Sequence, residues 1–260
     1  MITWFNETET SLWETNYLVN DILKNVNKDV LIFSSNKTSY EDVKKYLITT
    51  KIDIVIHLSD EWGFKEEYQE LSRYCEILLR QYTHPMYRNY ANIIYIPLGY
   101  MTNMFEPDYI KMSTPINRYY KWSFIGSLKQ DRQEMVTKFK TIQPNIYSHE
   151  LQASDMREIY RKSIFVLNGR GNVKLDCFRL YEASACGAIP IVVGCKKEIK
   201  ETFKHMQCKY WLYFENWDEA LSRCQKILQD KKELEMRSVG VTQWWVDIIN
   251  KINNQLIFGL

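Results

Sequence analysis

The chain has 260 residues, 45% of them hydrophobic and 25% charged, a composition that is typical of a folded globular protein and excludes a disordered one. Its 34 Lys and Arg residues nearly balance 32 Asp and Glu residues, so the net charge of +2 gives no electrostatic reason to expect a nucleic-acid partner. The sequence contains no run of about 18 apolar residues, so it predicts no membrane span. Its acidic N-terminus lacks the apolar segment of a signal peptide. We therefore expect a cytoplasmic protein.

The first hundred residues alternate between strand-like apolar runs and segments with helical periodicity. This alternation predicts a mostly parallel sheet with helices on both faces. The expected strands are 29–34, 51–58, 76–80 and 92–97, and the expected helices are 40–50 and 64–74.

The pattern breaks between residues 99 and 119, a segment that contains Pro107 and Pro115 and has little periodicity. We interpret it as a linker between domains, because the alternation restarts after it. A helix capped by Ser154 is expected to run to Arg161. The other expected helices are 131–140, 176–186, 198–206, 217–229 and 239–256, and the expected strands are 121–125, 145–148, 163–167, 188–193 and 210–214.

The sequence thus predicts an α/β protein with two Rossmann-like domains that face each other across a cleft. The first domain is expected at 1–100, the linker at 101–117 and the second domain at 118–238, with 239–260 packing back on the first domain. Ligands of such sheets bind beyond the carboxyl ends of the strands, so the loops that follow strands are the candidate site.

The loop 168–176, with the sequence NGRGNVKLD, follows one predicted strand and precedes a helix. Its two glycines allow close approach of the backbone, Arg170 and Lys174 bring positive charge, and the next helix adds its N-terminal dipole. Loops with these features are typical of sites that bind a diphosphate. The loop matches neither G-x-G-x-x-G nor a P-loop, and an ordinary turn with solvated charges is the alternative.

The helix after this loop places Asp176, Arg179 and Glu182 on one face. The small residues at 183–188 indicate that this helix is buried, and buried charges need partners. Arg179 would suit a diphosphate and Glu182 the hydroxyls of a ribose, whereas an ion pair on a solvated helix is the alternative.

A second loop begins with Gly126 and Ser127 and leads to Arg132, one turn into the next helix. Its backbone N–H groups could meet an anion. A helix cap with exposed cations explains the same residues equally well.

In the first half, the loop after strand 51–58 carries two adjacent carboxylates, Asp60 and Glu61, beside Trp62. A carboxylate half-buried by Trp can have a raised pKa and act as a general base, and Trp62 can support a sugar ring. Arg80 ends the next strand and could hold one of the carboxylates. No D-x-D triplet is present, which favours a site without metal, built from Arg side chains and a helix dipole.

Several segments resemble the nucleotide-sugar domain of exostosin-like glycosyltransferases. These segments are WSFIGS at 122–127, SIFVLNGRG at 163–171, DCFRLYEA at 176–183 and GAIPIV at 187–192. In the first half, HLSDE at 57–61, LRQY at 79–82 and IPLGY at 96–100 resemble the compact exostosin-like enzymes of algae and large algal viruses, xylosyltransferases among them.

The resemblance implies a GT-B fold and an inverting transfer that needs neither metal nor cofactor. It also implies a donor, a nucleoside-diphosphate sugar, bound mainly by Arg170, Arg179 and Glu182 of the second domain. We expect a UDP-sugar, with UDP-xylose favoured, and a glycan hydroxyl as acceptor, in the host cytoplasm if the protein is viral. A catalytically silent protein that binds a nucleotide or sugar on the same fold is the alternative.

The general base is expected in the first domain, because the second domain would hold the leaving diphosphate. Asp60 is the first candidate and Glu61 the second, with Trp62 and Arg80 on the acceptor side. The alternative is that Asp60 caps the next helix while Glu61 is solvated.

Overall fold

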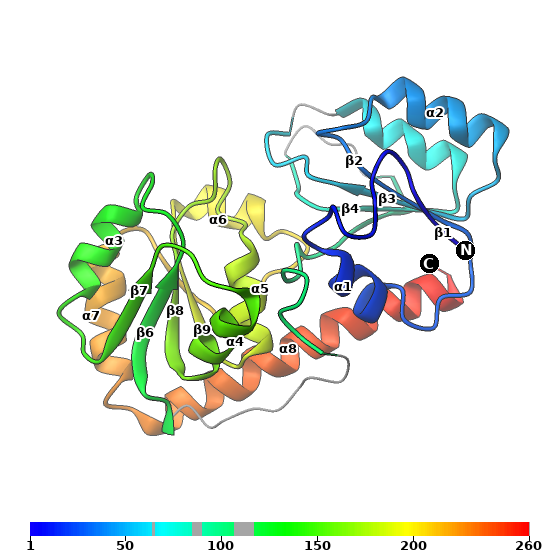
Figure 1. The fold of residues 1–260 in the computed structure, drawn as a ribbon. Helices are drawn as coiled ribbons and strands as arrows, with labels where there is room; N and C mark the ends of the chain where they lie inside the picture. The colour runs from blue at the N-terminus through cyan, green and yellow to red at the C-terminus, as the bar shows by residue number, and fades with distance from the viewer. Residues whose placement is uncertain (64–65, 85–89, 107–116, 260) are drawn as a thin grey trace.

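The computed structural model describes residues 1–63, 66–84, 90–106 and 117–259. The chain forms two five-stranded parallel sheets, one in each half (Figure 1). This arrangement confirms the predicted α/β architecture with two domains.

The first sheet has its strands in sequence order, β1-β2-β3-β4-β5, and all neighbours are parallel. Side chains of β2 alternate between its two faces: Val30 and Ile32 belong to one core, and Leu31 and Phe33 belong to another. Both faces of this sheet are therefore covered. The strands are β1 (Ile2–Trp4), β2 (Val30–Ser34), β3 (Ile54–Leu58), β4 (Ile77–Arg80) and β5 (Ile93–Tyr95), and the helices are α1 (Thr15–Tyr17), the π-helix η1 (Leu18–Ile22), α2 (Tyr40–Thr49) and the 3-10 helix η2 (Glu66–Tyr74).

The second sheet has the order β10-β9-β8-β6-β7. The chain runs outward from β6 to β7, returns to β8 on the other side of β6, and continues to β9 and β10. The strand order therefore reverses between β6 and β8, and the loops that follow these two strands separate there. The strands are β6 (Tyr120–Ile125), β7 (Asn145–Ser148), β8 (Ser163–Asn168), β9 (Ile189–Val193) and β10 (Leu212–Phe214), and the helices are α3 (Arg132–Phe139), α4 (Ala153–Arg161), α5 (Phe178–Ala185), α6 (Lys196–Thr202) and α7 (Trp217–Ile227).

A long C-terminal helix, α8 (Lys231–Phe258), connects the two halves (Figure 1, orange to red). It packs against α5 of the second half and against η1 of the first. The Asn253 side chain donates hydrogen bonds to the carbonyl oxygens of Asp21 and Ile22, at 2.6 and 2.8 Å. One hydrophobic core includes side chains of both sheets together with Trp245 and Leu256 of α8, so this helix fixes the halves relative to each other.

Some of the expected elements need correction. The helix α4 begins at Ala153 and is preceded by Gln152, so Ser154 lies in the first turn and is not the cap. The described part of the expected helix 64–74 is a 3-10 helix, and α8 begins at Lys231 rather than at 239.

The sequence does not predict β1, α1 or η1. The strand β1 has three residues at the edge of its sheet, which is too short to show a periodicity. Of the expected linker, residues 107–116 lie outside the described residues, and Met104 and Phe105 are buried in the core shared by both halves.

The packing of α8 predicts an unusual effect at Gly240. Replacing a glycine in an exposed helix by alanine stabilises it by about 1 kcal/mol, but a Cβ at Gly240 would lie 2.4 Å from Cδ1 of Tyr210. We expect Gly240→Ala to lower the free energy of unfolding by roughly 1–3 kcal/mol, measured by chemical denaturation. Val239→Ala, on the exposed side of the same helix, should change it by less than about 0.5 kcal/mol. A stabilised Gly240→Ala variant would contradict this packing.

Candidate functional site

A pocket of about 440 Å³ opens where the strand order of the second sheet reverses, and we call it the switch-point pocket. The loops after β6, β7 and β8 and the start of α5 line it, together with residues of the first half. Open α/β sheets bind their ligands at this position. The structure brings together here six residues that the sequence predicts to bind a nucleotide sugar: Gly126, Ser127, Arg132, Asp176, Arg179 and Glu182.

Two guanidinium groups of this pocket lie close to Gly126. The backbone of Gly126 has a φ of +143°, and a Cβ there would lie 3.3 Å from Nη2 of Arg179 and 3.9 Å from Nη1 of Arg132. Both guanidinium carbons also lie over the ring of Phe124, at 4.9 Å for Arg179 and 5.7 Å for Arg132. The glycine therefore leaves room where two cations from different helices converge.

Neither arginine forms an ion pair within the described part of the chain. Arg132 donates a hydrogen bond to the carbonyl oxygen of Ser127 at 3.1 Å, and Nε of Arg179 donates to that of Ile125 at 3.0 Å. Arg132 is only 4% exposed, and burial together with the charge of Arg179 lowers its pKa. Arg179 beside it is half-buried, and because like charges held close together away from water are costly without a counter-ion, this pair suits an anionic ligand.

Two buried carboxylates, Asp176 and Glu182, line the same pocket. Asp176 accepts a hydrogen bond from the hydroxyl of Tyr181 at 2.7 Å, and Glu182 accepts one from the amide of Met101 at 3.3 Å. Burial raises the pKa of each carboxyl to about 7, and the charge of Glu61 contributes at Asp176. Both carboxyl groups can accept hydrogen bonds from the hydroxyls of a ligand.

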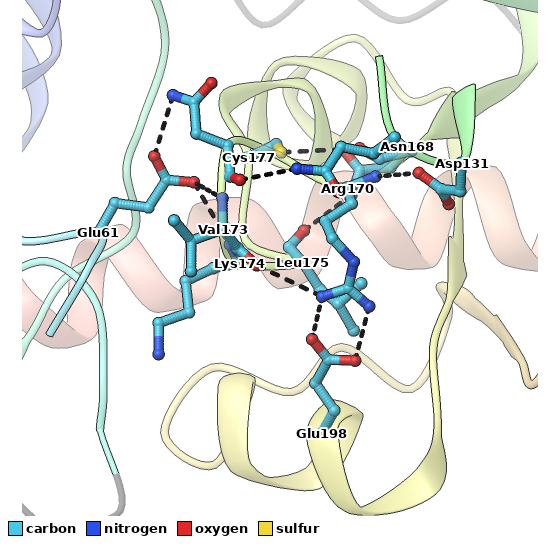
Figure 2. Close-up of polar contacts among 12 residues, drawn as sticks. Glu61, Asp131, Asn168, Arg170, Val173, Lys174, Leu175, Cys177 and Glu198 are labelled. Carbon is cyan, nitrogen blue, oxygen red and sulfur yellow. Dashed lines mark hydrogen bonds and ion pairs between the residues drawn. The ribbon is translucent and has the colours of Figure 1, made fainter. Parts of the chain in front are cut away.

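Arg170 does not line this pocket, contrary to the sequence-based expectation. Its guanidinium forms a two-point ion pair with Glu198 of α6, with Nη2 and Oε2 at 2.8 Å (Figure 2). Its backbone amide donates to Oδ1 of Asp131 at 3.0 Å. Arg170 therefore fixes the loop 169–177 against two helices, and its charge is already compensated.

Glu61 extends from the first half of the chain to this loop (Figure 2). Its Oε1 accepts hydrogen bonds from the amides of Val173 and Lys174, at 2.9 and 3.3 Å, and its Oε2 accepts one from Nδ2 of Asn172 at 3.2 Å. A carboxylate on backbone amides is a favourable contact. Glu61 therefore joins the two halves at the pocket, and donors occupy both of its oxygens.

Asp60 is not among the residues that line the switch-point pocket, and its burial in an ion pair disfavours the role of general base that the sequence predicts. Asp60 is 4% exposed, and its Oδ2 accepts a hydrogen bond from Nη2 of Arg80, at 2.7 Å. Arg80 is fully buried in β4 and lines no described pocket. This buried ion pair supports the loop that carries Glu61 and Trp62. Trp62 itself is 57% exposed.

A second pocket, of about 390 Å³, adjoins the switch-point pocket on the side of the first sheet, and we call it the first-sheet pocket. Trp62 lines it, as do Trp13 and Glu14 from the loop between β1 and α1, which the sequence analysis did not single out. In the sequence, the pattern that could have identified this loop is an indole followed directly by a carboxylate. The residues shared by both pockets are Trp13, Glu61, Tyr82, Asn172 and Phe178.

Neither a metal centre nor a membrane-spanning helix is found in the described residues. None of their His, Cys, Asp and Glu side chains form a group of three or more that could hold a metal ion. No helix among them combines the length and the apolar character needed to cross a membrane.

Known proteins with a similar structure have low sequence identity to this chain. An O-GlcNAc transferase mutant from Thermobaculum terrenum has a TM-score of 0.60 and 8% identity, and the match covers 99% of this chain and 65% of that one. An alpha-glucosyltransferase in complex with UDP and a 13-mer DNA has a TM-score of 0.53 and 13% identity, with 91% and 82% covered. A putative UDP-N-acetylglucosamine 2-epimerase from Listeria monocytogenes has a TM-score of 0.54 and 13% identity, with 97% and 80% covered. No protein-family model and no curated protein sequence matches.

These likenesses show the fold. The chain has a GT-B fold, with two α/β domains of parallel strands, and it spans 65% of the length of the Thermobaculum transferase. Transferases and an epimerase share this architecture, so the function has to be argued from the pocket.

The raised pKa of Glu182 predicts how stability depends on pH. Because the pKa rises from 4.5 to about 7, the folded state keeps a proton that the unfolded state releases. The free energy of unfolding should therefore fall as the pH rises through this window. Glu182→Gln removes this pH-dependent loss of stability. Chemical denaturation should therefore give the variant and the parent similar free energies of unfolding near pH 4.5. Above pH 7 the free energy of unfolding of the variant should be higher by roughly 3 kcal/mol. A difference that is the same at every pH would contradict the raised pKa.

Proposed function

We propose that this protein transfers a sugar from a nucleoside-diphosphate sugar to a hydroxyl group of a carbohydrate. The observation that carries the proposal is the pair of a buried Arg132 and a half-buried Arg179, whose guanidinium groups converge at Gly126 and form no ion pair in the described chain. A diphosphate supplies two adjacent anionic groups, which match two adjacent guanidinium groups.

The same pair suits the chemistry of the leaving group. As the bond between the sugar and the diphosphate breaks, negative charge accumulates on the diphosphate oxygen. Arg132, Arg179 and the N-terminus of α5 are already in place to stabilise this charge, since both guanidinium carbons lie over the ring of Phe124. A pocket arranged in this way lowers the barrier without reorganising during the reaction.

Glu182 suits the ribose of the donor. Its carboxylate lines the pocket beside Arg179, and once ionised it can accept hydrogen bonds from two neighbouring hydroxyls. UDP is the nucleotide that we propose, because one structurally similar transferase is in complex with UDP. The proposal for UDP rests on that likeness and on the sequence resemblance.

Finer assignments follow from the resemblance to exostosin-like glycosyltransferases. We propose an inverting transfer that needs no metal, with UDP-xylose as the donor. Two of the three residues that the resemblance assigns to the donor, Arg179 and Glu182, line the switch-point pocket, which supports the proposal, whereas Arg170 does not. The cytoplasmic location stays a prediction from the sequence.

Arg179 and Arg170 provide a matched comparison, because both are cations of the same loop and helix region but only Arg179 lines the pocket. Isothermal titration of UDP should show that Arg179→Gln weakens binding at least about tenfold, since a hydrogen bond to a charged group contributes about 1.5–3 kcal/mol. Arg170→Gln should weaken binding clearly less than Arg179→Gln, because it removes an ion pair that anchors the loop but no contact with the diphosphate. Equal losses in the two variants, or a parent that binds no UDP, would contradict the proposed diphosphate site.

The donor sugar can be tested by thermal denaturation with separate UDP-sugars. Ligands that bind the folded state raise the Tm, and at equal concentration a ligand that binds more tightly raises it more. UDP-xylose should raise the Tm more than UDP-glucose, UDP-galactose, UDP-N-acetylglucosamine or UDP-glucuronic acid. A larger shift with any of the other four would overturn the assignment of xylose as the donor sugar but not the proposed transferase activity.

A further inference from the structure

The first-sheet pocket presents two exposed indole rings beside the switch-point pocket. Trp13 is 62% exposed and Trp62 is 57% exposed, and among the described residues the other exposed aromatic side chains are Tyr119 and Phe258. The Trp13 loop is held in place, because Thr102 donates hydrogen bonds to the Trp13 carbonyl oxygen from its amide, at 2.6 Å, and from its hydroxyl, at 2.9 Å. Fixed aromatic faces of this kind pack against the apolar faces of sugar rings.

The charges of this pocket disfavour an anionic ligand. Three carboxylates line it, those of Glu7, Glu14 and Glu61, and Lys37 is the one cation among its described lining residues. Lys37 is paired with Glu7 at 2.9 Å. The other polar lining residues are neutral hydrogen-bonding groups, namely Ser11, Ser34, Asn36, Ser59, Gln81 and Asn172. An uncharged molecule with many hydroxyls fits this lining, whereas a phosphate or sulfate group would meet negative charge.

Glu14 is the carboxylate of this pocket with the fewest protein partners. It is 5% exposed, and Nε2 of Gln81 donates to its Oε1 at 3.1 Å. The carboxylates of Glu7 and Glu61 have more donors: Ser11 and Lys37 bind Glu7, and the loop 172–174 binds Glu61. Burial raises the pKa of Glu14, and the nearby charge of Glu7 raises it further. A raised pKa makes the ionised carboxylate a stronger base.

We propose that the first-sheet pocket binds an uncharged saccharide acceptor against Trp13 and Trp62, and that Glu14 takes the proton of its attacking hydroxyl. This inference rests on the proposed function. The acceptor oxygen forms a bond to the anomeric carbon of the donor while the bond from that carbon to the diphosphate oxygen breaks. The hydroxyl proton passes to the Glu14 carboxylate, and the electron pair of the broken bond leaves with the diphosphate, next to Arg132 and Arg179.

The position of Trp13 agrees with an acceptor that extends from the first-sheet pocket to the donor. Trp13 lines both pockets, and its ring lies 6.3 Å from that of Phe178, the first residue of α5. A saccharide on Trp62 that extends over Trp13 therefore reaches the mouth of the switch-point pocket. Glu14 follows Trp13 directly in the chain, so the base and the sugar platform belong to one fixed segment.

The binding part of the proposal is tested with maltose, cellobiose, xylobiose and diacetylchitobiose as neutral probes, and with a heparin disaccharide and a DNA oligonucleotide as anionic ones. Titrations followed by tryptophan fluorescence, with UDP present, should show binding of at least one neutral probe. Trp62→Ala should weaken it by about tenfold or more, with the Kd for UDP within about threefold of the parent. Tyr119→Ala, which removes an exposed ring that lines neither pocket, is the control. Stronger binding of an anionic probe, or no binding of any neutral one, would overturn the proposal.

The catalytic part is tested by transfer to the neutral probe that binds, with the UDP-sugar that stabilises the parent most. Glu14→Gln should lower kcat by at least about 100-fold and remove the acidic limb of the pH profile of kcat. Its Kd for UDP should stay within about threefold. Glu9→Gln, an exposed carboxylate of the same segment, is the matched control and should keep the parent kcat.

The outcomes separate the two proposals. If the parent binds no UDP, the proposed function fails. If UDP binds and sugar is transferred while Glu14→Gln keeps its kcat, only the role of Glu14 fails. If Glu14→Gln loses UDP binding as well as activity, Glu14 has a structural role and the proposal is overturned.

Discussion

The guanidinium groups of Arg132 and Arg179 converge at Gly126, and neither forms an ion pair within the described residues. The fold imposes this contact, because Arg132 begins α3 after β6, Arg179 lies in the first turn of α5 after β8, and these two strands are neighbours where the strand order reverses. Arg132 is buried and Arg179 half-buried, so their mutual repulsion opposes folding, and an anionic ligand between them would relieve it. The rest of the pocket can be understood as the framework that keeps these two side chains in place.

That framework depends on ion pairs and hydrogen bonds outside the pocket. Arg170 and Glu198 anchor the loop after β8 on one side, and Glu61 from the first half holds it on the other. The shared core and α8 keep the two sheets in one relative position, so the first-sheet pocket and the switch-point pocket stay adjacent. Charged residues of this region thus differ in their surroundings, since Arg179 lines the pocket whereas Arg170 positions the backbone of the loop.

Periodicity and spacing in the sequence predicted the two sheets and the joint position of Arg179 and Glu182, because these follow from local geometry. The partner of Arg170 could not be predicted, since Glu198 lies 28 residues further on, in another helix. The burial of Asp60 depends on its ion pair with Arg80 of the neighbouring strand, which the sequence does not show. The sequence places carboxylates next to the indole of Trp62, but it does not show which of these side chains faces solvent. Trp13 and Glu14 follow a strand of three residues, which is too short for a periodicity to draw attention to the loop behind it.

The most direct test of this account is a crystal structure of the protein with UDP. The account predicts that diphosphate oxygens lie within hydrogen-bonding distance of both the Arg132 and Arg179 guanidinium groups, with the ribose hydroxyls at Glu182. Arg170 should remain paired with Glu198. A diphosphate bound to Arg170, or UDP bound away from Gly126 with the arginine pair still unoccupied, would contradict it.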